Sequence, residues 1–289
     1  MYNFPMKKLF LIIVLFSLSL QSSFAWNLEN FNSQRDERAV KRLLQSQVRY
    51  ANSTNFKKFI STYDASYMNS DGFDYDKYSN LVKDTWNAFS NIKYDIEIKK
   101  VVAKDGCATA DVIEHSYAKL PSQTKELLGE LRGESICVYS LKKVNGKWKV
   151  ISDAILDETT SMMYGEAKNL DVKLTVPESV EAETEYTASL EFVPPEETMA
   201  IASIAADVVE YPQSPTKEVF RTMPSDNILE RLFVANNQSK NEYIVASIGL
   251  TKAEICDISM KLSLTGYGYK MKRVSVIQKK DELSSDENK

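Results

Sequence analysis

Residues 92–99, IKYDIEIK, place an apolar or aromatic side chain at every second position. That alternation is typical of a β-strand with one buried face. Upstream of it, from Val40 to Phe89, apolar residues recur instead at intervals of three and four, which is typical of amphipathic helices. The change of period near residue 90 therefore predicts an α+β fold in which helices pack on one face of a curved antiparallel sheet.

Three helices are expected before the change of period. Ser33 followed by Asp36 is a capping-box-like start for the first, Ser53 is expected to cap a second, shorter helix, and Asp74 a third. Each helix carries one apolar stripe: Val40, Leu43, Leu44, Val48 and Ala51 in the first, Phe56, Phe59, Ile60 and Tyr63 in the second, and Tyr78, Leu81, Val82, Trp86 and Phe89 in the third.

Four antiparallel strands are expected after the change of period. Asn145-Gly146 is the clearest hairpin signal in the chain, because both residues accept a positive φ. The expected strands cover 92–99, 107–119, 134–143 and 148–156.

The second half of the chain has a different texture, with six prolines and no tryptophan from residue 166 onward. Strand-like runs separated by turn residues predict a β-sandwich over 166–278, after an α+β domain over 26–165 and before a charged, disordered tail over 279–289. Gly266 and Gly268 are expected to form a bulge or bend. The expected strands cover 170–176, 184–193, 200–210, 229–235, 243–250, 258–265 and 270–277.

Residues 1–25 have the pattern of a secretory signal peptide. Two lysines precede an apolar run over 9–20, and Ser23-Phe24-Ala25 offers small residues at the cleavage site. The run is short for a permanent membrane span. We therefore expect a mature chain that begins at Trp26, has no membrane span after cleavage and is secreted or periplasmic.

The composition argues against several classes of function. The chain has a formal net charge of −4 and no basic cluster, which is a poor fit to a nucleic-acid partner. One histidine and three cysteines are too few soft ligands for a zinc or transition-metal site. Because dinucleotide, phosphate-loop and hydrolase motifs are also missing from the sequence, neither a cofactor nor a metal is expected.

The order of elements in the first half resembles the nuclear-transport-factor-two-like superfamily, the cone fold of ketosteroid isomerases and SnoaL-like polyketide cyclases. The residues that carry the resemblance are the capped helix at 40–51, the run 55–63, the Asp71-Gly72 loop and the hairpin 144–150. The resemblance implies a ligand pocket between helices and sheet, and a homodimer through the N-terminal sheet. In the second half, 176–180 leading into 186–190 resembles the opening of bacterial immunoglobulin-like modules.

Five residues are candidates for lining such a pocket, and three for catalysis in it. His115 is the sole histidine, and histidine is the residue type most often used as a general acid or base. Strand alternation places it on one face with Asp111 and Tyr117, and these three are the weak catalytic candidates; Glu114 falls on the opposite face. The pocket candidates are Tyr63, Tyr67, Trp86, Glu134 and Asp153.

Cys107 and Cys137 fall in two expected strands of the same domain. Export would permit a disulfide between them if the strands pair in a suitable register, and two small buried side chains are the alternative.

Three functions remain open on the sequence. The first is an exported, non-catalytic binding or adaptor protein that holds a small apolar ligand or a protein partner. The second is an isomerase- or cyclase-type enzyme of the SnoaL and ketosteroid-isomerase group. The third is an envelope assembly or adhesion component. Convergent buried carboxylates would favour the enzyme, a dry apolar cavity the binding protein, and a core filled by side chains the assembly component.

Overall fold

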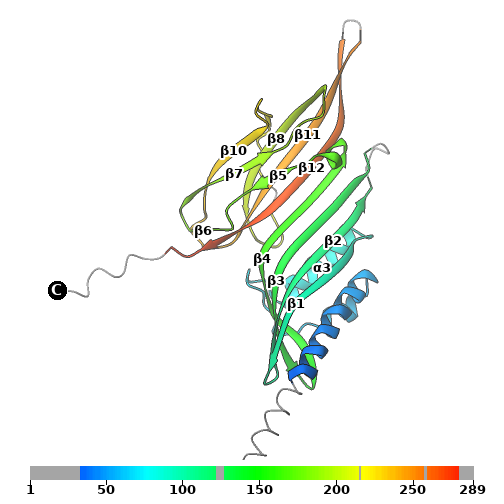
Figure 1. Ribbon diagram of the computed structural model, residues 1–289, viewed down its shortest axis with the longest axis vertical. Helices are drawn as coiled ribbons and strands as arrows, with labels where there is room; N and C mark the ends of the chain where they lie inside the picture. The colour runs from blue at the N-terminus through cyan, green and yellow to red at the C-terminus, as the bar shows by residue number, and fades with distance from the viewer. Residues whose placement is uncertain (1–32, 122–126, 215, 257–258, 280–289) are drawn as a thin grey trace, which may run out of the picture.

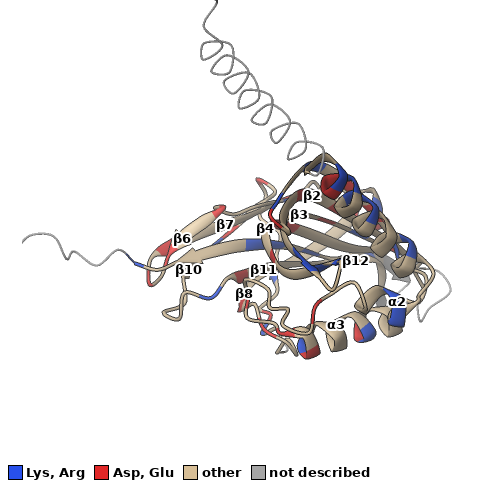
Figure 2. Cartoon of the chain, turned by 90° about the horizontal axis from the view of Figure 1, so that it is seen from below, with Lys and Arg blue, Asp and Glu red and all other residues tan. Residues whose placement is uncertain are grey.

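The structure, a computed structural model, describes residues 33–121, 127–214, 216–256 and 259–279 (Figure 1). These residues are mostly sheet with three α-helices, as the sequence predicts: 33–52, α2 (Phe56–Ile60) and α3 (Tyr75–Ala88). Basic and acidic residues lie intermixed along the outer sides of helix 33–52 and α3 (Figure 2). The expected leader over 1–25 and nearly all of the expected tail lie outside the described residues.

The helix caps confirm one expectation and correct another. The Asp74 side chain accepts a hydrogen bond from the Lys77 N–H and so caps α3. The cap of α2 is Asn55, which accepts from the Lys58 N–H. Ser53 is not that cap, because its hydroxyl bonds the carbonyls of Arg49 and Tyr50 and so belongs to the end of the preceding helix.

The strands form two sheets, one of nine strands and one of three. The larger has the order β1-β2-β3-β4-β12-β11-β8-β9, with β6 beside β12, and the smaller the order β10-β7-β5. The strands of the larger are β1 (Lys93–Lys104), β2 (Cys107–Leu120), β3 (Gly129–Val144), β4 (Lys147–Gly165), β6 (Ser179–Glu181), β8 (Thr198–Val208), β9 (Arg221–Thr222), β11 (Glu242–Cys256) and β12 (Ser259–Ile277). Those of the smaller are β5 (Lys173–Thr175), β7 (Glu185–Glu191) and β10 (Ile228–Val234).

The four-stranded sheet expected in the first half does not end with that half. β4 continues to Gly165 and pairs with β12 through the register Gly165↔Gly266 to Thr159↔Lys272, so one sheet runs through both halves (Figure 1). The division into domains at residue 165 therefore stays a prediction.

The two strands expected over 258–265 and 270–277 are one strand, β12. The expected bulge is present: Leu250 pairs with Gly266 and Thr251 with Leu264, which leaves Thr265 as the extra residue. The glycines serve close packing on β4, because a Cβ at Gly268 would lie 2.2 Å from Met163 Sδ.

Two cores lie on opposite faces of the large sheet. Met163 packs against the core shared by the two sheets, whereas Tyr164 packs with Trp86 and Phe89 of the helical side. Consecutive strand residues point to opposite faces. The helices and the three-stranded sheet therefore cover opposite faces, at different ends of the same sheet.

The register explains why Cys107 and Cys137 do not form a disulfide. Cys107 lies opposite Lys142 and Cys137 opposite Val112, several positions apart along the β2–β3 pair. Both thiols are free, with Cys137 buried and Cys107 exposed. The structure thus has no Cys107–Cys137 disulfide. Of the two small buried side chains expected as the alternative, only Cys137 is buried.

Candidate functional site

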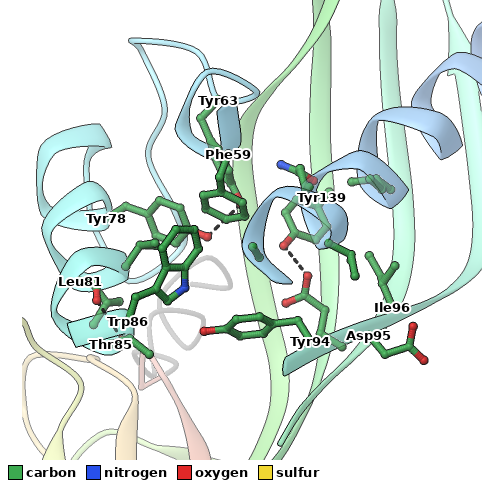
Figure 3. Close-up of a pocket in the computed structure, with 16 residues that line it drawn as sticks. Phe59, Tyr63, Tyr78, Leu81, Thr85, Trp86, Tyr94, Asp95, Ile96 and Tyr139 are labelled. Carbon is green, nitrogen blue, oxygen red and sulfur yellow. Dashed lines mark hydrogen bonds between the residues drawn. The ribbon is translucent and has the colours of Figure 1, made fainter. Parts of the chain in front are cut away.

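A cavity of about 180 Å³ lies between the helices and the concave side of β1, β2 and β3 (Figure 3). Helix 33–52 contributes aliphatic side chains from its apolar stripe, including Leu44, Val48 and Ala51. Half of the remaining lining residues are aromatic. The rings that line it are those of Phe59, Tyr63, Tyr78, Trp86, Tyr94 and Tyr139.

Strand alternation explains which residues the sheet turns toward the cavity. On the inward face of β2, Ala108, Ala110 and Val112 are buried in the helical core, and Glu114, next on that face, lines the cavity. Strand alternation on β1 turns Tyr94 and Ile96 toward the same hollow. The sheet therefore presents one carboxyl group from β2 beside the side chains of β1 and β3.

Glu114 is the carboxyl group that faces this cavity from the sheet. Its Oε1 accepts a hydrogen bond of 2.7 Å from the Tyr139 hydroxyl (Figure 3). Burial raises the pKa of Glu114, and the hydrogen bond from Tyr139 opposes that rise. The second carboxylate on the wall, Asp95, points away from the hollow (Figure 3).

Behind the cavity lies a cluster of tyrosines. The hydroxyls of Tyr63 and Tyr78 are 2.9 Å apart, and the ring of Tyr67 meets that of Tyr63 edge-on. The Tyr67 hydroxyl donates to Asp153 Oδ2 at 3.0 Å. Burial is the main cause that raises the pKa of Asp153 to about 7, while the hydrogen bond from Tyr67 lowers it. The other carboxyl oxygen, Oδ1, is buried and has no hydrogen-bond partner.

The structure separates the five pocket candidates. Tyr63 and Trp86 line the cavity. Tyr67 and Asp153 lie one layer behind it. Glu134 is placed elsewhere: it lies on the outward face of β3, exposed, with its Oε2 3.4 Å from His115 Nδ1.

The three weak catalytic candidates also lie away from the cavity. His115 and its face-mates Asp111 and Tyr117 point outward from β2, because Val112 on the alternate face is in the helical core. The alternation separates His115 from Glu114 correctly, but the choice of His115 left out Glu114, which is the one that lines the cavity. A lone carboxylate in line with Ala108, Ala110 and Val112 is the signal that would have identified Glu114.

The sequence reasoning also missed Tyr78, Tyr94 and Tyr139 as wall residues. Within the described parts of the chain, no group of three or more His, Cys, Asp or Glu side chains is placed to hold a metal ion. Across the same residues, none of the helices combines the length and apolar character that a bilayer crossing requires.

No family model matches the chain, and neither does any curated protein. Several solved structures match part of it. A putative scytalone dehydratase from Novosphingobium aromaticivorans is 13% identical, with 42% of this chain and 83% of that chain covered and a TM-score of 0.36. An epoxide hydrolase from M. tuberculosis is 12% identical, with 43% and 84% covered and a TM-score of 0.30.

Bd1075 of Bdellovibrio bacteriovorus is 13% identical, with 41% of this chain and 39% of that chain covered and a TM-score of 0.34. The match thus spans about two fifths of Bd1075. These TM-scores are low, so the class of protein is defined by the helices, strand order and register themselves: an α+β chain with a ring-lined cavity under its helices.

Proposed function

We propose that this chain is an exported binding protein that holds a small, largely apolar molecule in the cavity between α3 and the sheet. The observation that carries the proposal is the cavity of about 180 Å³, walled mainly by aromatic and aliphatic side chains. Small-molecule sites are typically concave and apolar with a few placed polar groups. Here the placed polar group is the Glu114 carboxyl, held by Tyr139.

The finer assignment of the fold belongs to the same proposal. Three helices packed on β1 to β4 support a cone domain of the nuclear-transport-factor-two-like type. Two sheets that share one core support an immunoglobulin-like sandwich in the second half. A homodimer through the outer face of the N-terminal sheet would cover Val102 and Ile136, which are 47% and 39% exposed.

The binding test uses the two small apolar probes phenol and toluene, followed by tryptophan fluorescence, because Trp86 lines the cavity. We expect a saturable change in fluorescence. Ala51→Phe, which fills the cavity, should abolish it, and Val102→Phe on the outer face should leave it unchanged. Native mass spectrometry of the purified protein would also detect any molecule that co-purifies with it. Absence of saturable binding by both probes would contradict the proposal.

Export is tested separately by N-terminal sequencing of the protein recovered from outside the cytoplasm. We expect the first residue to be Trp26. An exported form that retains residues 1–25 would contradict this part of the proposal.

A second candidate function, proton transfer of the isomerase or cyclase type, is favoured by Glu114 itself. A carboxyl group whose pKa burial raises above its ordinary value can act as a general acid or base. We would test it by deuterium exchange into cyclohexanone, which Glu114→Gln should abolish. A cavity left open by side chains favours either function over the assembly or adhesion role.

A further inference from the structure

The charges around the cavity are unbalanced. Its sixteen lining residues include two acids, Glu114 and Asp95, and no lysine, arginine or histidine. Glu114 takes part in none of the ion pairs formed by the described residues. A buried carboxyl without a counter-charge is costly in its ionised form. A cation that entered the cavity would remove that cost.

The aromatic wall suits the same kind of ligand. The face of an aromatic ring carries partial negative charge and attracts cations, most strongly when the contact is shielded from water. In Figure 3 the rings of Trp86, Tyr78, Tyr94 and Tyr139 stand around one space. Glu114, which accepts the hydrogen bond from Tyr139, lines the same cavity. These rings come from α3, β1 and β3, so the cage is built from three separate elements.

We propose that the cavity binds a small organic cation, an alkylated ammonium group, with its alkyl groups against the rings and its charge next to Glu114. This inference rests on the proposed binding function and deepens it by naming the class of ligand. A neutral ligand with a carbonyl group is the competing occupant, since a protonated Glu114 would donate a hydrogen bond to it.

The two occupants differ in their dependence on pH. An ammonium ligand requires ionised Glu114 and should bind more weakly as the pH falls, whereas a carbonyl ligand requires the protonated form and should bind more tightly. Other ionisable groups surround Glu114, and burial raises the pKa of each of them. They are Tyr139 on β3, Tyr94 on β1, Tyr78 on α3, Tyr63 after α2, and Asp153 and Glu158 on β4.

The tyrosines stay neutral over the pH range of the test. Only the other carboxyl groups can therefore add to the pH dependence of ligand binding. Asp153, with its pKa of about 7, changes charge there, and burial raises the pKa of Glu158 as well. Glu114→Gln separates their contribution, since it removes the charge at the cavity and keeps an amide oxygen that can accept from Tyr139.

The experiment is a calorimetric titration of the purified protein with a matched pair of probes, choline and its neutral carbon isostere 3,3-dimethylbutan-1-ol. At about pH 8 we expect choline to bind about tenfold more tightly than the isostere, a ratio within reach of a shielded cation–ring contact with a carboxylate. The ratio should be lower at about pH 5, and lower in Glu114→Gln at either pH. Glu134→Gln, at an exposed position on the outward face of β3, is the matched control and should leave the ratio unchanged.

Each outcome bears on one of the two proposals. Equal binding of both probes would overturn the cation inference and leave the binding function in place. If neither choline nor its isostere binds while phenol and toluene still do, the cation inference alone is overturned. Loss of all four probes would overturn both proposals. Should Glu114→Gln not fold, the comparison of the wild-type ratio at the two pH values decides the matter.

Discussion

At the scale of single residues, the contact between Tyr139 and Glu114 sets the properties of the cavity. The hydroxyl of Tyr139 is the one group identified as lowering the pKa of Glu114, against the larger effect of burial. We therefore expect Tyr139→Phe to raise the pKa of Glu114 further, measured by carbon-13 NMR titration of the carboxyl group. Tyr117→Phe, on the outward face, is the control. An unchanged Glu114 pKa in Tyr139→Phe would mean that the hydrogen bond is absent in solution.

Asp153 should make stability depend on pH. Its pKa is about 7 in the folded chain against an ordinary value of 3.8, so the folded state holds a proton that the unfolded state has released between those values. The free energy of unfolding should therefore fall as the pH rises from about 4 to 7, by up to roughly 4 kcal/mol. Glu114 and Glu158 act in the same direction.

Asp153→Asn isolates this contribution, because the Asn carbonyl oxygen can still accept from Tyr67. The variant should be more stable than the wild type at about pH 7 and lose the advantage at about pH 4, by urea unfolding at each pH. A wild type and a variant that differ by the same amount at both pH values would contradict the assignment.

Burial is also the reason why sequence reasoning did not single out Glu114, the carboxyl group on the cavity wall. Alternation along 107–119 separates the faces of β2 and puts His115 opposite Glu114, and the structure confirms that separation. Ala108, Ala110 and Val112 identify the inner face of β2 from the sequence alone. The rise in the pKa of Glu114 cannot be predicted from the sequence, because it depends on helices that cover the strand from elsewhere in the chain.

At the scale of elements, the close approach of β12 to β4 depends on glycine. A Cβ at Gly268 would lie 2.2 Å from Met163 Sδ and 2.9 Å from the Met162 carbonyl oxygen, which is backbone and cannot turn away. We expect Gly268→Ala to reduce the free energy of unfolding by about 1–3 kcal/mol. Gly249→Ala, whose Cβ would meet an Ile201 side-chain carbon at 3.2 Å, should cost less. The two costs are compared by urea unfolding, and equal values would contradict the packing argument.

Local signals predicted these elements better than their pairing. Asn145-Gly146 predicts the β3–β4 hairpin, and both residues have positive φ in the structure. The bulge expected at Gly266 is present, but it lies inside the single strand β12 and not between two separate strands. These glycines pack closely against β4, which lies far away along the chain. No local sequence pattern could therefore have revealed this contact.

At the scale of the whole molecule, a buried ion pair connects the two cores. Arg273 on β12 pairs with Asp71 in the loop between α2 and α3, and their side chains are 0% and 4% exposed. Asn241 also donates to Asp71, at 2.8 Å. Nearby, the Tyr243 hydroxyl donates to Glu158 Oε2 at 2.9 Å, from β11 to β4. These contacts tie the helical side of the first half to the sheet of the second.

Removing one partner of this ion pair should lower the free energy of unfolding substantially. Arg273→Met leaves Asp71 buried without its cation, and we expect a loss of about 3–5 kcal/mol in the free energy of unfolding. Adding Asp71→Asn should recover part of that loss. The exposed pair Lys173–Glu191, at 3.8 Å, is the control and should contribute about 1 kcal/mol or less. Additive effects of Arg273→Met and Asp71→Asn in a double-mutant cycle would show that the two residues do not interact.

The most direct test of the account asks whether the space under α3 is open and receives a ligand. Backbone and side-chain NMR spectra, recorded while phenol is added, report which residues sense it. We predict saturable shifts confined to the wall, with Trp86, Tyr94 and Glu114 among the largest, and unchanged signals from His115 and Glu134 on the outer face. Shifts that centre on the outer face, or a wall that does not respond at all, would contradict the account.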